Sequence, residues 1–187
     1  MGRGFWVLAK VNALRDPALT ESYSVAHLFA PASTVRFRHK VRSGEAPDDP
    51  DYPMPAVYVD YLVPKDNNEP LSLEFFTADG ERVNGYTVED SQADNGAAES
   101  RAEENMRLST VEFIESAELT SKPGLNRFAW DMRYAGAWHK DEDRRFRNGP
   151  LIAPGEYIVR LQLGEQSFEQ RVEVIADPRL APVGVTT

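Results

Sequence analysis

The run PGEYIVRLQLGEQSFEQRVEVIADPR, at 154–179, constrains the fold of this chain more than any other stretch. Apolar residues recur at alternate positions on both sides of a turn at Gly164-Glu165-Gln166: Tyr157, Val159, Leu161 and Leu163 before it, and Phe168, Val172 and Val174 after it. A period of two on each side of a glycine turn predicts a β-hairpin with one buried face. We therefore expect strands to build the core.

The same alternation occurs earlier in the chain. Residues 56–64 (AVYVDYLVP) and 71–76 (LSLEFF) each place their large apolar side chains on one face, and Asp79-Gly80 predicts the hairpin turn that follows. Further strands are expected at 109–119 and 124–134, with an edge-type strand near 35–41. About seven strands separated by turn signals favour an all-β chain, and more specifically an antiparallel β-sandwich.

Proline and charge set the expected boundaries of this sandwich. Asp16-Pro17 and Ala30-Pro31 exclude a long helix near the N-terminus, and residues 43–56 carry four prolines and four acids, which is typical of an extended linker. We expect a strand and connecting arm at 1–46, the sandwich at 47–180 and a tail at 181–187. The polar residues 89–108 predict a surface insertion, with a short helix over 97–108 as the alternative.

The net charge of −9 disfavours nucleic-acid binding, and no stretch approaches the roughly 18 apolar residues of a membrane-spanning helix. The chain has no cysteine, and its three histidines (His27, His39 and His139) lack the spacing of a zinc site. No phosphate-binding loop, G-x-S-x-G elbow or calcium loop is present, so we expect no metal and no cofactor. Acids gather only in polar segments, at 48–51, 103–104 and 141–143, where solvated carboxylates are the ordinary interpretation.

The chain opens with GRGFWVL, a strand-like apolar run too short for a signal peptide. Together with GLNRFAWDMRY at 124–134, GP…APGEYIVRL at 149–161 and DPR at 177–179, it resembles the C-terminal part of bacterial sortilin-like, BNR-repeat proteins, often labelled glycosyl hydrolases. The Ig-like domain of flagellar hook-assembly scaffold proteins has a similar, looser pattern. Ala9-Lys10 departs from the sortilin-like family, which usually has two acids there, and no Asp-box is present.

This resemblance implies a large β-propeller followed by an immunoglobulin- or fibronectin-III-like β-sandwich, in a periplasmic or secreted setting. The strand at Phe5–Leu8 would then close the last blade of an upstream propeller. On this interpretation the chain is either one domain of a longer protein or a truncated reading frame.

The best-marked candidate site is Trp130 with its neighbours Asn126, Arg127, Asp131 and Arg133. We expect Trp130 in the core, because it shares one face with other large apolar residues. Asn126 suits a turn by bonding the local backbone, while Asp131 and Arg133 can pair with neighbouring strands or pin a loop. The alternative is a ligand groove in which the indole stacks on a sugar ring.

Pro154, Gly155 and Tyr157 begin the last hairpin and complete the family-like structural motif.

A second candidate is the charged segment 135–150, which we expect to form a long loop. It contains Trp138, His139, Arg145, Phe146 and Arg147. Aromatic and arginine side chains are frequent interface anchors, so we expect this segment to dock on a propeller or another protein. Stacking on a glycan is the alternative.

Three functions remain. The leading hypothesis is a non-catalytic accessory sandwich that caps or orients a neighbouring propeller. The second is a carbohydrate-binding module that uses exposed loop aromatics. The third is part of a glycoside hydrolase whose active site lies mostly outside this chain.

Overall fold

The computed structural model describes residues 13–17, 25–37, 55–88, 119–137 and 148–180. The predicted strand at Phe5–Leu8, the segment 89–108 and most of the predicted strand at 109–119 lie outside these residues. The described elements are a short 3-10 helix, η1 (Ala13–Arg15), and the strands β1 (His27–Leu28), β2 (Thr34–Arg36), β3 (Val57–Val63), β4 (Leu71–Thr77), β5 (Arg82–Thr87), β6 (Gly124–Trp130), β7 (Arg133–Ala135), β8 (Asn148–Leu151), β9 (Gly155–Leu163) and β10 (Gln166–Ala176). The all-β prediction is confirmed.

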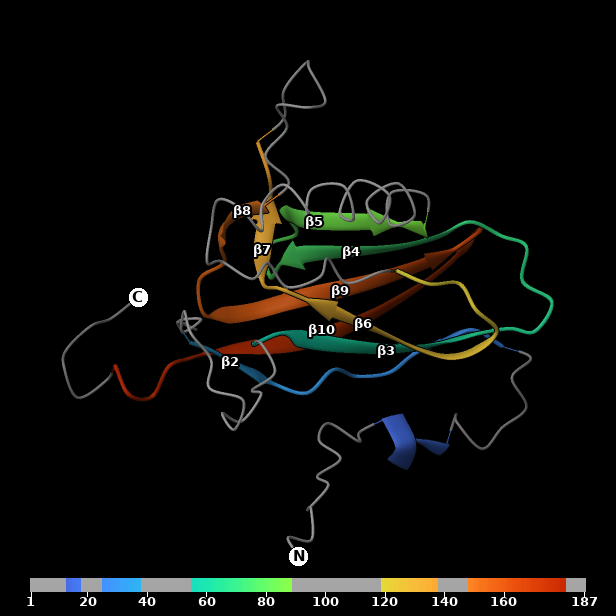
Figure 1. Ribbon diagram of the computed structural model, residues 1–187, viewed down its shortest axis with the longest axis horizontal. Coiled ribbons are helices and arrows are strands. Elements are labelled where there is room, and N and C mark those ends of the chain that lie inside the picture. The colour runs from blue at the N-terminus through green and yellow to red at the C-terminus, as the bar shows by residue number, and fades with distance from the viewer. Residues whose placement is uncertain (1–12, 18–24, 38–54, 89–118, 138–147, 181–187) are drawn as a thin grey trace, which may run out of the picture.

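The strands form three sheets. One has the order β1-β3-β6, a larger one the order β2-β10-β9-β4-β5, and β7 and β8 form a two-stranded ribbon. The larger sheet is curled into a half-barrel. In Figure 1, β5, β4, β9 and β10 follow one another across this sheet, and the ribbon stands at one end of it. Six of the described strand pairs are antiparallel: β1 with β3, β3 with β6, β4 with β5, β4 with β9, β9 with β10 and β7 with β8.

The two larger sheets face each other across an aromatic core. Trp130 on β6 stacks on Phe75 of β4, with ring centroids 4.0 Å apart and planes 19° apart. Tyr157 of β9 meets the indole edge-on at 6.0 Å. Trp130 is fully buried, as the alternation predicted, and so are the inward residues of β3 and β4. Burial of large aromatic and branched side chains on facing sheets supplies most of the stabilisation.

The predicted turns form as expected. The chain reverses at Asp79-Gly80, where Gly80 has a φ of 87° and its N–H donates to the Thr77 carbonyl at 3.0 Å. Gly164, with a φ of 54°, closes the turn between β9 and β10. Glycine suits both positions because this region of backbone conformation strains residues that carry a Cβ.

Residues 25–37 join the two sheets. β1 pairs with β3 in one sheet, and β2 pairs with β10 in the other. The side chain of Gln170 on β10 donates to the Leu28 carbonyl at 3.1 Å. This part of the predicted connecting arm therefore lies in the same sheets as the strands that follow it.

One strand pair corrects the antiparallel prediction. β2 runs parallel to β10, with Thr34 opposite Val174 and Arg36 opposite Ala176. The chain passes from one sheet to the other through Ala30-Pro31 without reversing into a hairpin, and a direct crossing between sheets places β2 parallel to the last strand. β2 does lie at the edge of its sheet, where the edge-type strand was expected.

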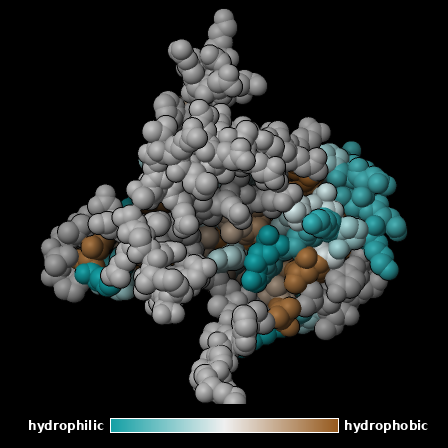
Figure 2. Space-filling view, in the orientation of Figure 1, coloured by the Kyte–Doolittle hydropathy of each residue, from teal (hydrophilic) through white to brown (hydrophobic). Residues whose placement is uncertain are grey.

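The surface of the described residues is mixed in character. Figure 2 shows hydrophilic residues gathered at the end of the molecule where Figure 1 places the connection between β3 and β4. Lys65, Asp66, Asn68 and Glu69 belong to this connection. No helix among the described residues is long and apolar enough to cross a membrane.

We predict that Trp130→Ala lowers the free energy of unfolding by about 3–5 kcal/mol, because it removes a buried indole from between two sheets. Chemical denaturation measures the change. Leu125→Ala on the same strand is the matched control, since Leu125 is 42% exposed, and we expect a change within about 0.5 kcal/mol. Equal losses from the two variants would contradict a core centred on Trp130.

Candidate functional site

A strained corner follows β6. The strand ends at Trp130, and Met132 adopts a φ of 59°, the one positive value at a residue other than glycine among the described residues. The Met132 side chain is nevertheless buried in the core. Alternation across 124–134 predicted one continuous strand, whereas the chain turns here and resumes as β7. Strained backbone persists only where surrounding contacts enforce it, and such strain is concentrated at functional sites. Among the described residues, this corner is therefore the strongest candidate for a functional site.

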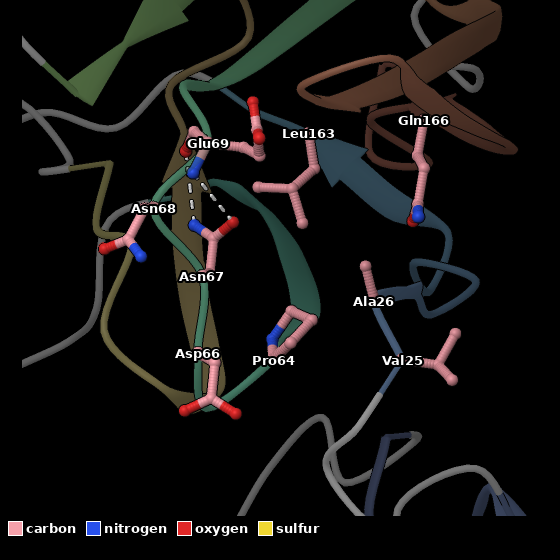
Figure 3. A pocket seen from close by; sticks show the side chains of 9 residues that line it. All are labelled: Val25, Ala26, Pro64, Asp66, Asn67, Asn68, Glu69, Leu163 and Gln166. Atoms are coloured by element: carbon pink, nitrogen blue, oxygen red, sulfur yellow. Dashed lines mark hydrogen bonds between the residues drawn. The ribbon is translucent and has the colours of Figure 1, made fainter.

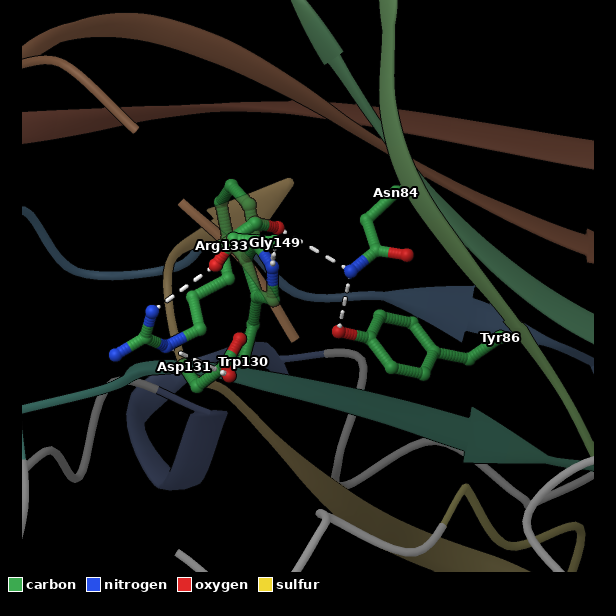
Figure 4. A network of polar contacts seen from close by, with 6 residues as sticks. All are labelled: Asn84, Tyr86, Trp130, Asp131, Arg133 and Gly149. Atoms are coloured by element: carbon green, nitrogen blue, oxygen red, sulfur yellow. Dashed lines mark hydrogen bonds and ion pairs between the residues drawn. The ribbon is translucent and has the colours of Figure 1, made fainter. Parts of the chain in front are cut away.

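Arg133 connects the corner to three strands (Figure 4). Its Nη1 donates to the Gly149 carbonyl of β8 at 3.0 Å. Its own carbonyl accepts from Asn84 Nδ2 of β5 at 3.2 Å and from the Trp130 indole at 3.3 Å. Arg133 therefore bonds to neighbouring strands, one of the two roles predicted for it.

Asp131 is only partly neutralised. Its Oδ2 lies 3.6 Å from Arg133 Nε, while its Oδ1 is buried and has no hydrogen-bond partner. Burial raises the pKa of Asp131, and the positive charge of Arg133 opposes that shift. Burial, together with the charge of Asp131, also raises the pKa of Tyr86 far above its ordinary value. The corner thus holds a carboxylate whose ionised form is destabilised.

Asn126 and Arg127 have structural contacts on β6. The Asn126 amide donates to the carbonyls of Lys122 and Gly124 at 2.7 and 2.9 Å, which is the backbone bonding predicted for it. Arg127 forms a bidentate pair with Asp60 of β3, at 2.7 and 2.9 Å. This geometry gives the strongest form of ion pair, and it ties β6 to β3 from the outer face.

The start of β9 is fixed by its tyrosine. Tyr157 donates its hydroxyl hydrogen to the Ala153 carbonyl at 2.7 Å, across Pro154 and Gly155. The DPR motif closes on itself in a similar way, since Arg179 donates to both carboxylate oxygens of Asp177 and holds the pKa of that carboxyl below its usual range. Arg179 also lies over the ring of Phe37, which follows β2.

The predicted ligand or interface residues Trp138, His139, Arg145, Phe146 and Arg147 lie outside the described residues. The described strands nevertheless fix the two ends of that segment, because Ala135 of β7 pairs with Asn148 of β8. Sequence reasoning assigned residues 148–150 to a loop, whereas they belong to a strand.

A pocket of about 330 Å³ lies at the opposite end of the sheets, between the β3–β4 connection and the β9–β10 turn. Figure 3 shows Leu163 and Gln166 on one side of it and the loop residues 66–69 on the other. Asn67 bonds the backbone of Glu69 in both directions, at 3.1 and 3.2 Å. The carboxylates of Asp66 and Glu69 point away from each other, so the pocket lacks the paired carboxylates of a glycosidase.

Sequence reasoning missed Asn84, Tyr86 and Asp60, which complete these contacts. One signal was present for Asn84, since a glycine inside a strand, here Gly85, often marks a bulge. The acidic segments at 48–51, 103–104 and 141–143 lie outside the described residues. Within the described ranges, no group of three or more acidic or histidine side chains could hold a metal ion.

No family model, curated protein or solved structure matches this chain.

We predict that the stability of Asp131→Asn relative to the natural protein depends on pH. Because burial raises the folded-state pKa of Asp131, ionisation costs more in the folded than in the unfolded chain. This penalty is absent below the ordinary pKa of 3.8 and grows as the pH rises toward the folded-state value. Asp131→Asn should therefore gain stability relative to the natural protein over that interval.

Chemical denaturation at a series of pH values measures this difference. Asp66→Asn, at an exposed position of the β3–β4 connection, controls for the removal of one negative charge. A relative stability of Asp131→Asn that stays constant or falls as the pH rises would contradict the raised pKa.

Proposed function

We propose that this chain is a non-catalytic accessory β-sandwich that packs on or orients a β-propeller of the sortilin-like, BNR-repeat type. One observation carries the proposal: the described side chains of the family-like motif make contacts within the domain. Trp130 fills the core, Asn126 and Arg127 secure β6, and Arg133 pins β8. A motif used in this way maintains a fold. The described residues of the motif do not converge on one point as catalytic groups would.

The strand order supports an immunoglobulin- or fibronectin-III-like form of this sandwich. β1, β3 and β6 would be strands A, B and E, while β5, β4, β9 and β10 would be strands C′, C, F and G. The bond from Tyr157 to the Ala153 carbonyl has the form of a tyrosine corner, which occurs near the start of strand F. Two features depart from antibody domains: the chain has no cysteine, and the buried tryptophan lies on strand E.

The contact surface of this proposal is the segment between β7 and β8. Its ends are held by strand pairing, by the Arg133–Gly149 bond and by the corner at Met132. Its sequence contains the aromatic and basic residues that anchor protein interfaces, among them Trp138 and Phe146. The resemblance further supports a periplasmic or secreted location.

The size of the native gene product tests the accessory role. We predict that an antibody raised against this chain detects a protein far larger than 21.0 kDa in the cells that make it, because the domain would be continuous with a propeller. An antibody-reactive product confined to about the size of this chain would contradict the proposal. Turnover of a fluorogenic glycoside by the purified chain would also contradict it.

A carbohydrate-binding module is the second candidate, favoured by the ribbon that holds both ends of an aromatic segment. On this alternative, Trp138→Ala would weaken binding to immobilised glycans at least about tenfold, as expected for an aromatic anchor. Leu125→Ala, distant in sequence from the segment, is the control and should keep full affinity. A folded Trp138→Ala protein with unchanged glycan binding would exclude this candidate.

A further inference from the structure

Asn84 and Gly85 lie at an irregularity in β5. Asn84 pairs with Phe75 of β4, but Arg82 pairs with the adjacent Phe76, so Val83 is an additional residue in β5. This is the geometry of a β-bulge, and β5 is the last strand in the described order of its sheet. Both Asn84 and Gly85 are partly exposed, so solvent reaches this dipeptide.

The backbone of Gly85 is directed at the side chain of the residue before it. Its N–H donates to Oδ1 of Asn84 at 2.9 Å. Loss of that proton would leave a nucleophilic nitrogen next to the same side-chain amide. Position 85 has no Cβ, and the space that a Cβ would take is filled by the guanidinium of Arg82.

We propose that Asn84 is a site of spontaneous deamidation in the folded protein. A solvent base removes the Gly85 N–H proton, and the nitrogen attacks Cγ of Asn84. The new N–Cγ bond closes a five-membered imide, and the Cγ–Nδ2 bond breaks as ammonia leaves with a proton from solvent. One water molecule then opens the imide at either carbonyl, which gives aspartate or isoaspartate at position 84.

This reaction would alter the corner described above. In the intact protein, Asn84 Nδ2 donates to the Arg133 carbonyl at 3.2 Å and to the Tyr86 hydroxyl at 2.9 Å. A carboxylate has no hydrogen to donate, and it would face the Arg133 carbonyl as a second acceptor. It would also add negative charge to a corner in which Asp131 is already incompletely paired. Deamidation therefore removes the hydrogen bond that joins Asn84 of β5 to Arg133 of β7, whether or not the proposed accessory function is correct.

Mass spectrometry of the intact chain, held folded in mildly alkaline buffer, tests the proposal. Tryptic peptides are analysed by fragmentation for the mass gain of deamidation and for isoaspartate at position 84. We expect the rate at Asn84 in the folded protein to be within a few-fold of the rate in the same chain unfolded in urea. Asn126, which bonds the preceding turn and is followed by arginine, is the internal reference and should remain intact.

Gly85→Ala is the matched variant, and it should slow the reaction because the added methyl hinders attack on Cγ. The added methyl would displace the guanidinium of Arg82, which is the end of a flexible side chain, so we expect the variant to fold. A rate at Asn84 more than about tenfold slower in the folded than in the unfolded chain would overturn the proposal, because the reaction would then require local opening. That comparison uses the natural sequence and does not depend on the variant.

The structural consequence has its own measurement. Hydrogen exchange of the Arg133–Ala135 amides should be faster in Asn84→Asp than in the natural protein, with the amides of β9 unchanged. Equal exchange of β7 in the two proteins would show that the Asn84 bond to Arg133 does not hold the ribbon, and would overturn the proposed effect of deamidation.

Discussion

The stacking of Trp130 on Phe75 is the contact on which the rest of this structure depends. It joins the last residue of β6 to the middle of β4, and so holds the two larger sheets face to face. With Trp130 fixed in the core, the chain must turn immediately after it. Met132 accepts a positive φ while its side chain remains buried, and this burial offsets the strain of the turn. The corner therefore follows from the core.

Alternation of apolar residues was sufficient to predict the core strands. In β3 the side chains of Val57, Val59 and Tyr61 face inward as their period of two requires, and Trp130 is buried for the same reason. Period two gives the direction of a side chain but not the partner of a strand. The parallel pairing of Thr34 with Val174 joins residues far apart in the sequence, and no local pattern specifies it. The arm was therefore predicted as a connection, although its strands β1 and β2 each form an edge of one of the two larger sheets.

For the polar residues of the candidate site, the sequence predicted the type of contact but not the distant partners. Local chemistry predicted that Asn126 would bond nearby backbone, because its partners Lys122 and Gly124 are close in sequence. Arg133 instead depends on Asn84 and Gly149, which tertiary structure brings to it from β5 and β8. The buried oxygen of Asp131 has the same origin, since its surroundings exist only after those strands meet. The role of a residue that depends on distant strands cannot be predicted from the local sequence pattern.

The charge arrangement on the larger sheet favours the proposed contact at the β7–β8 end. On its outer face Arg160 bonds Glu169 at 2.7 Å and lies over the ring of Phe76 at 4.4 Å, while Arg82 bonds Glu74 at 3.0 Å. A partner that covered this face would have to desolvate these charged pairs, which costs free energy that their mutual attraction only partly returns. Between the paired strands β7 and β8, by contrast, the sequence is rich in aromatic and arginine residues. An accessory domain would therefore orient its neighbour through the end of the sandwich and keep the face of its larger sheet in solvent.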